Sequence, residues 1–234
     1  MNFYYHPNPE EYLFLSAEES GHVVKVLRGK SGDQFTILDG KGHSYIAEIT
    51  DPKPKACAFK IIDKTAASSK EFRIHLAIAP TKSTDRLEWF VEKACELGVD
   101  EISILSTQRT ERKRTKTDRL NKKAISALKQ SKNVWKCQIN EPQDLKKFAN
   151  LNKRAAQKFV AYVETGDEDL LQHKLDAQTE VLILIGPEGD FSPEEIDLLK
   201  NLGYELVSLG QSVLRTETAG IVAVHTVNMV NQAI

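Results

Sequence analysis

The chain has 234 residues, 41% of them hydrophobic and 28% charged, as in an ordinary globular protein, and its length fits one large domain or two of moderate size. The formal net charge of −1 gives no reason to expect a polyanion as partner, although a local basic patch could still bind one. Three scattered cysteines without a C-x-x-C pair exclude a disulfide framework and a zinc ribbon, and the six histidines lack ligand spacing, so no metal site is predicted.

Residues 1 to about 64 are predicted to form a small β-rich domain. The first residues, MNFYYHPNPE, lack the basic and apolar regions of a secretory signal. Ser16 and Glu19 have the spacing of a capping box, which predicts a helix through the following GHVVKVLR. Two β-rich runs around residues 39–42, Asp-Gly-Lys-Gly, predict a hairpin, and ACAFKII predicts another strand. The polar segment 65–71, TAASSKE, is predicted to be a linker.

After residue 71 the pattern changes to strands that alternate with helices, which predicts an α/β domain with a mostly parallel sheet. The predicted strands are FRIHLAIAP, EISIL, KFVAYV, VLILI and YELVSL. Helices are predicted over DRLEWFVEKACELG, which ends at Gly98, over about residues 117–131, and from Thr216 onward. The longest apolar run, 181–185, is far too short to cross a bilayer.

The stretch LIGPEGDFSPEEI, residues 184–196, reads as a loop between a buried strand and a helix. Ser192 and Glu195 form a capping box, with a proline at the first helical position. Open α/β sheets bind ligands at the carboxyl ends of their strands, where Gly186 and Gly189 would let the backbone approach a bound molecule or adopt positive φ. A simple tight turn explains the glycines equally well. Neither a P-loop nor G-x-G-x-x-G is present, so phosphate binding is not indicated.

A second glycine-containing loop, SLGQSVLRTETAG, lies between a strand and the last helix. Thr216 as an N-cap and Glu217 at the positive helix end have ordinary structural explanations. Arg215 has none, and an arginine at the carboxyl end of a sheet strand points to a charged or polar ligand group. Two such loops at one edge of the sheet could form a single cradle.

The segment from Arg109 to Lys136 is strongly basic. Eleven basic residues against two acidic ones give it a charge of +9, so the rest of the chain sums to −10. A charge run is usually a solvated face, but so lopsided a segment in a neutral protein is more typical of a surface that contacts phosphates. Trp135 could stack on a base, although a lone tryptophan is more often part of a core.

The loop pair LIGPEGDFSPEEI and SLGQSVLRTETAG resembles the motif pair of the RsmE family. These SPOUT-superfamily enzymes methylate a uridine of small-subunit ribosomal RNA at N3 with S-adenosylmethionine. KSTDRLEWFVEKACELGVDEI and HVVKVLR resemble two further family segments, so the likeness covers nearly the whole chain. Two departures stand out: the family usually has Gly at Asp190, and Glu-Gln where Lys129 and Gln130 stand. Asp190 leaves cofactor binding intact if its side chain points outward, whereas Lys129 bears on RNA or substrate contacts.

The resemblance implies a fold and partners that the residues alone do not. Residues 69–234 would form a SPOUT domain, a mostly parallel α/β sheet whose C-terminal strands and loops make a trefoil knot. Residues 1–68 would form a PUA-like RNA-binding β-barrel. The family further implies a cytoplasmic homodimer that acts on 16S rRNA within the small ribosomal subunit, with S-adenosylmethionine as cofactor and with neither a membrane nor a metal.

The same resemblance implies the site residues. The catalytic candidates are Arg215 and Glu217. The residues expected to bind the cofactor are Tyr162, Val163, Glu164, Leu184, Ile185, Gly186, Glu188, Gly189, Leu209, Gly210, Val213, Leu214, Thr216 and Ala219. The residues expected to bind RNA are His22, Lys25, Arg28, Lys82, Arg86, Arg109, Arg112, Lys113 and Arg114.

Methylation of uracil at N3 requires that the N3 proton be removed and that the charge spreading onto the uracil oxygens be stabilised. Arg215 cannot be the base, because a guanidinium does not deprotonate in proteins, but it can stabilise the oxygens or hold a phosphate. Glu217 or Glu188 could be the base, and the sequence does not choose between them.

Two alternative functions stay open. One is a related knotted enzyme acting on a ribose 2′-oxygen or on another base, against which the PUA-like domain argues. The other is a non-enzymatic rRNA-binding assembly factor, against which the intact GPEG and LRTETAG segments argue.

Overall fold

The computed structural model describes residues 2–68, 70–111, 115–152 and 154–232 and divides the chain into two compact units. The N-terminal unit comprises Met1–Ser69 with Ile125–Lys136, and the sheet unit comprises Lys70–Ala124 with Cys137–Ile234. The segment 125–136 thus packs with residues far earlier in the chain, an association that the sequence did not indicate. In the described part of the chain, no helix has the length and apolarity needed to cross a membrane.

The N-terminal unit is built on a four-stranded sheet in the order β1-β2-β3-β4. Its strands are β1 (Phe3–Tyr5), β2 (Gln34–Leu38), β3 (His43–Asp51) and β4 (Ala58–Ala66). The predicted hairpin is confirmed as the antiparallel pair β2–β3, with Gly40 at φ 73° and Gly42 at φ 103° in its turn. The predicted linker was partly wrong, because β4 continues to Ala66, which pairs with His43.

The helix predicted after Ser16 is confirmed as α1 (Ala17–Gly21), which continues as a π-helical turn over His22–Val26. Ser16 accepts a hydrogen bond from the amide of Glu19, as one half of the capping box. The Glu19 carboxylate accepts instead from Lys129 Nζ at 2.6 Å. Lys129 therefore binds within the N-terminal unit, which gives this departure from the family pattern a structural reason.

Trp135 packs against the β2–β3 turn of the same unit. A Cβ at Gly42 would collide with the Trp135 ring, and the amide of Gly42 donates to the Val134 carbonyl at 3.0 Å. Lys136 donates its amide to the Gly40 carbonyl, also at 3.0 Å. The close approach of the indole explains why a glycine stands at residue 42, and it commits Trp135 to packing rather than to a base.

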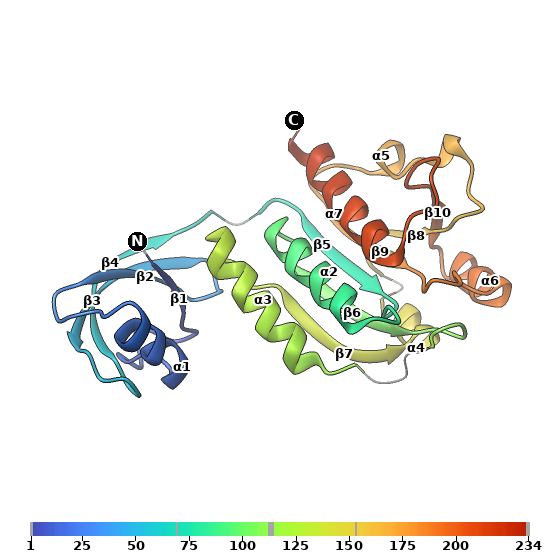
Figure 1. Cartoon of the computed structure of the whole chain (residues 1–234). Helices are drawn as coiled ribbons and strands as arrows, with labels where there is room; N and C mark the ends of the chain where they lie inside the picture. Colours follow the sequence, from blue (N-terminus) through green and yellow to red (C-terminus); the bar gives the residue numbers. More distant parts are fainter. Residues whose placement is uncertain (1, 69, 112–114, 153, 233–234) are drawn as a thin grey trace. The chain divides into compact units, whose positions relative to one another are not determined.

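The sheet unit contains a parallel six-stranded sheet in the order β10-β8-β9-β5-β6-β7 (Figure 1), as the alternating pattern predicted. Its strands are β5 (Arg73–Ile78), β6 (Glu101–Ser106), β7 (Gln138–Asp144), β8 (Gln157–Ala161), β9 (Glu180–Ile185) and β10 (Glu205–Val207). The sequence missed β7, QINEPQD, because an edge strand with one neighbour needs no apolar run.

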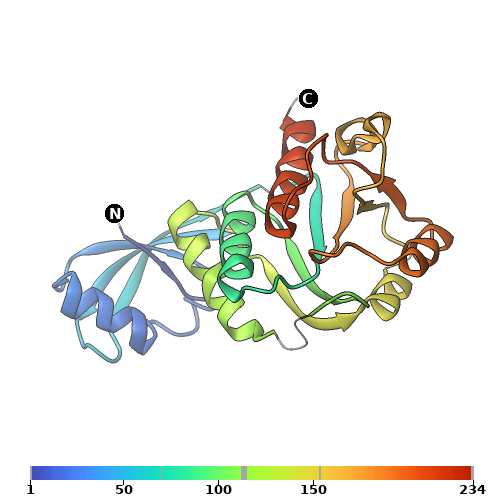
Figure 2. The ribbon, with the colours of Figure 1, turned by 45° about the vertical axis from the view of Figure 1, so that its right-hand side comes forward.

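Helices cover both faces of this sheet (Figures 1 and 2). Its longer helices are α2 (Thr84–Glu96), α4 (Leu145–Leu151), α6 (Pro193–Asn201) and α7 (Thr216–Gln232). The short helix α5 (Leu171–Lys174) packs against α7, and α3 (Thr117–Ser131) contributes residues to both units. The predicted start of α6 is confirmed, since Ser192 and Glu195 form a complete capping box.

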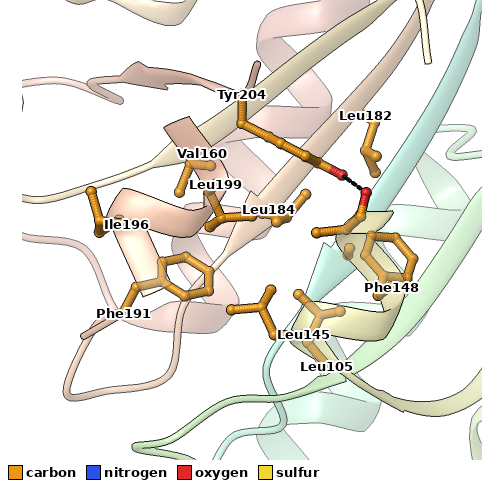
Figure 3. Packing of buried hydrophobic residues seen from close by; sticks show 12 residues of the cluster. Leu105, Leu145, Phe148, Val160, Leu182, Leu184, Phe191, Ile196, Leu199 and Tyr204 are labelled. Atoms are coloured by element: carbon orange, nitrogen blue, oxygen red, sulfur yellow. Dashed lines mark hydrogen bonds between the residues drawn. The ribbon is translucent and has the colours of Figure 1, made fainter. Parts of the chain in front are cut away.

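The apolar run of β9 is covered on both sides because alternate side chains face opposite helix layers. Leu182 and Leu184 pack with Phe148 of α4 and Leu199 of α6 (Figure 3). On the other face α2 and α7 pack together, and a Cβ at Gly220 of α7 would lie within 3 Å of the Phe90 ring. This two-sided burial holds β9 rigidly, so the loop that follows Ile185 starts from a fixed point.

Candidate functional site

Three neighbouring strands, β10, β8 and β9, end at the same edge of the sheet, and the loops that follow them line an open cavity of about 320 Å³. That volume lies within the range of small-molecule sites. The predicted cofactor residues that line it are Tyr162, Val163, Ile185, Gly186, Glu188, Leu209, Gly210, Val213, Leu214, Thr216 and Ala219. The two glycine loops therefore do form one cradle, and the loop after β8 completes it.

Three predicted cofactor residues lie outside this lining: Glu164, Leu184 and Gly189. Leu184 points to the opposite face of the sheet from Ile185 and packs in the core under α4 and α6. A Cβ at Gly189 would lie in ordinary contact with Arg109, 3.5 Å from Cδ. The cavity is instead lined by several residues that were not singled out for it: Ala161, Pro187, Asp190, Ser208, Gln211 and Ser212.

Gly210 is the glycine whose conformation matters most for the cavity. Its φ is +120°, and no heavy atom lies within 4 Å of the place where a Cβ would stand. Gly186 differs, because a Cβ there would meet Asp190 and Phe191 of its own loop. Gly210 thus leaves open the volume that a side chain would fill, whereas Gly186 allows the loop after β9 to fold tightly.

Asp190 connects two walls of the cavity. Its Oδ2 accepts from the amide of Val163 at 3.1 Å, and its Oδ1 accepts from the amide of Phe191 at 2.7 Å. Its backbone has φ 58°, a conformation that Asn and Asp adopt more readily than most residues. The side chain therefore points inward to the cavity wall, and the Val163 amide is occupied rather than available to a ligand.

Arg109 holds the same loop from outside. Its Nη1 donates to the carbonyls of Gly189 at 2.6 Å and of Phe191 at 3.3 Å. Burial raises the pKa of the Asp190 carboxyl above its usual value, and the amide bonds and Arg109 offset this only in part. Arg109, which the resemblance assigns to RNA, is in this structure a support of the loop after β9.

The raised pKa of Asp190 predicts a stability effect with a definite sign. The folded protein binds the Asp190 proton more tightly than the unfolded chain, so this contribution to stability is complete below about pH 3.8 and is lost as pH rises through the folded-state pKa. Asp190→Asn keeps one oxygen acceptor and tolerates positive φ but does not ionise. The free energy of unfolding of this variant relative to wild type should therefore increase with pH across that window.

Urea unfolding at a series of pH values measures this difference, with Asp197→Asn on the exposed surface of α6 as the matched control. A difference between Asp190→Asn and wild type that stays constant with pH would contradict the role given to the buried carboxylate.

A second hollow, of about 420 Å³, adjoins the cavity, because Arg215 lines both. Its other lining residues are Asp85, Arg86, Trp89, Glu217 and Thr218. The Glu217 side chain is only 10% exposed, and Arg86 Nε lies 3.7 Å from its Oε1. The structure thus brings the two catalytic candidates together but places Glu217 outside the first cavity. Glu188, the other candidate base, accepts from the Lys82 amide at 2.9 Å.

The predicted RNA-binding residues fall into separate groups. In the N-terminal unit, His22, Lys25 and Arg28 are exposed on the π-helical turn and just after it. In the sheet unit, Lys82 pairs with Glu111 at 2.8 Å, and Arg86 lines the second hollow. The remaining candidates, Arg112, Lys113 and Arg114, lie outside the described residues.

Part of the basic segment is committed to internal contacts. Arg119 pairs with Glu88 at 3.0 Å, and Lys123 lies 3.7 Å from Glu92. In the N-terminal unit, Lys132 stands over the Phe3 ring. The carboxylates of Glu88 and Glu92 therefore offset part of the +9 charge of this segment. Within the described residues, no group of three or more His, Cys, Asp or Glu side chains could hold a metal ion.

Residues 68–228 match the model of the RNA methyltransferase domain family, and residues 15–62 match that of the RNA methyltransferase PUA domain. The ribosomal RNA small subunit methyltransferase E of Bacillus subtilis is 26% identical over 92% of this chain and 88% of its own length. The Synechocystis protein of the same name is 29% identical over 94% of this chain and 73% of its own length.

Two solved structures cover the whole architecture. A probable rRNA-methyltransferase from Porphyromonas gingivalis is 36% identical, with a TM-score of 0.93 over 100% of this chain and 99% of that one. A methyltransferase of Legionella pneumophila in complex with its cofactor SAM is 30% identical, with a TM-score of 0.88 over 99% and 98% of the two chains.

Proposed function

This chain belongs to the RNA methyltransferase family that includes the ribosomal RNA small subunit methyltransferases E, and we propose that it methylates a specific uridine of 16S rRNA at N3. Its class is therefore that of an rRNA methyltransferase that uses S-adenosylmethionine. The observation that carries the proposal furthest is the position of Arg215, on the boundary between the cavity and the second hollow.

The residues of the cavity fit the proposed cofactor. When bound, S-adenosylmethionine supplies an electrophilic methyl group on a positively charged sulfur. Val163 and Val213, which line the cavity, are 59% and 79% exposed, and a bound adenosine would cover such apolar surface. The space beside Gly210 lets a ligand approach the backbone. Asp190 and Glu188 add carboxylates to the lining, in keeping with a ligand that carries positive charge.

Arg215 and Glu217 are proposed to have different roles at the acceptor uracil. Arg215 is proposed to stabilise the negative charge that spreads onto the uracil oxygens, since a guanidinium offers planar donors. Glu217 is proposed to take the N3 proton, because its carboxylate lies in the hollow next to Arg215 and has only a long ion pair with Arg86 in the described structure. Glu188 is the weaker candidate base, being bound to the Lys82 amide.

The larger organisation follows from family membership and stays part of the proposal. Residues 1–68 would act as a PUA-like RNA-binding domain and residues 69–234 as the knotted SPOUT domain, in a cytoplasmic homodimer that works on the small ribosomal subunit. The half-exposed Met229 on α7 is one apolar residue that a second copy could cover. Light scattering of the purified protein measures its mass, and the mass of a single chain would reject the dimer.

RNA binding is expected to depend strongly on salt. Changing Arg112, Lys113 and Arg114 together to Ala should reduce the slope of log K against log salt by about 2–3, since each lost phosphate contact removes about 0.7–0.9. Cofactor affinity should not change. A matched control replaces Arg119, Lys123 and Lys129, which are paired with carboxylates, and should alter the slope less. An unchanged slope in the first variant would mean that these three residues are only solvated.

Mass mapping of small-subunit rRNA from cells with and without this protein tests the function itself. A single uridine should lose one methyl group from its base when the protein is absent. A missing ribose methyl group would favour the alternative of a 2′-oxygen methyltransferase, and unchanged rRNA would favour an assembly factor without catalysis.

A further inference from the structure

We propose that the hollow beside Arg215 receives the acceptor base and that the indole of Trp89 is the surface on which this pyrimidine stacks. The inference rests on the proposed function and adds a substrate site to it. It concerns the sheet unit alone, because α2 and the start of α7 supply the residues that line the hollow.

The hollow lies next to the cavity. Arg215 lines both depressions, while its neighbour Thr216 lines the cavity and Glu217 lines the hollow. Consecutive residues at the start of α7 thus line the cavity on one side and the hollow on the other. A methyl donor in the cavity and an acceptor in the hollow would meet at Arg215, as a direct displacement requires.

Trp89 is an exposed aromatic residue at the edge of the hollow. Its neighbours in α2, Leu87, Phe90 and Val91, are buried, yet the Trp89 side chain is 46% exposed at the edge of a hollow lined by charged side chains. Within the described residues, no hydrogen bond or ring contact engages it. Proteins that read unpaired nucleotides stack the bases on such exposed aromatic rings. The other tryptophan of the chain, Trp135, is committed to packing on Gly42.

The charges of the hollow suit a neutral base better than a phosphate. Asp85 and Glu217 balance Arg86 and Arg215. In the proposed step the N3–H bond breaks and the proton moves to the Glu217 carboxylate. The N3 electron pair then forms the new N–C bond, and the electron pair of the broken C–S bond stays on sulfur. Arg86 Nε lies 3.7 Å from Oε1 of this carboxylate.

The experiment compares Trp89→Ala and Trp89→Phe in single-turnover methylation of small ribosomal subunits. Loss of base stacking should raise the subunit concentration for half-maximal rate about ten- to hundredfold in Trp89→Ala, whereas Trp89→Phe should recover most of this because a ring remains. Cofactor affinity by calorimetry and molecular mass by light scattering should stay at wild-type values. Leu151→Ala, which truncates another exposed apolar side chain on α4, is the matched control.

A second measurement does not depend on turnover. Oligouridine should quench tryptophan emission in wild type and in Trp135→Phe but not in Trp89→Phe, whose only tryptophan is Trp135. The assignment would be overturned if Trp89→Ala reached half-maximal rate at the wild-type subunit concentration, or if the Ala and Phe variants needed equally higher concentrations. It would also be overturned if oligouridine still quenched the emission of Trp89→Phe. A fall in mass for Trp89→Ala would make this residue a contact between two copies instead. Methylation by the wild type in the same assay shows separately whether the proposed function holds.

Discussion

Arg215→Ala should slow the chemical step of methylation about a hundredfold, which corresponds to about 3 kcal/mol of lost transition-state stabilisation. Arg215 lines both the cavity and the hollow, so it can act on charge that develops only as N3 attacks. Arg215→Lys should recover little of the rate, since an ammonium lacks the planar pair of donors. The measurement is single-turnover methylation of small ribosomal subunits, with nuclease digestion to locate the methyl group.

The matched control is Arg73→Ala, which removes a half-exposed arginine at the opposite end of β5, next to Glu101. The wild-type rate should also rise with pH until the acceptor or its base is ionised, whereas a ribose hydroxyl would stay far from ionised over the same range. A methyl group found on the ribose, or Arg215→Ala turning over like wild type, would reject this mechanism.

Gly210→Val should abolish measurable binding of S-adenosylmethionine. The glycine has φ +120°, and the place of its missing Cβ is open space beside the cavity, so a branched side chain would strain the backbone and occupy the site. Positive φ in a β-branched residue costs about 1–3 kcal/mol of stability, which urea unfolding measures separately from binding by calorimetry.

Gly32→Val is the matched control for the strain. Gly32 has φ +92° with no heavy atom within 4 Å, but it lies in the N-terminal unit. It should lose similar stability and keep wild-type cofactor affinity. Gly189→Val should have the smaller effect on affinity, since its side chain would meet Arg109 rather than the cavity. A folded Gly210→Val protein with unchanged affinity would refute the cavity as the cofactor site.

Several elements could be predicted because their sequence signals are local. A capping box at Ser192 places the start of α6, and an apolar run identifies β9 as a strand covered on both faces. Glycines with positive φ mark the β2–β3 turn and the ends of α2 and α6. All strands of a parallel sheet have their carboxyl ends at the same edge. The two glycine loops could therefore be expected to meet there, with Arg215 beside them.

Which side chains meet depends on the folded arrangement of the strands and loops and could not be predicted from local patterns. The order β10-β8-β9 brings the loop after β8 into the cavity, and Asp190 then binds the Val163 amide across it. Arg109 could be counted as a positive charge from the sequence, but its Nη1 donates to carbonyls about eighty residues later. Periodicity and capping report on a few neighbouring residues, whereas hydrogen-bond partners and exposure depend on chain segments that folding brings together. For the same reason the two tryptophans were not separable by sequence, since Trp135 is covered by a turn from far earlier in the chain and Trp89 is not.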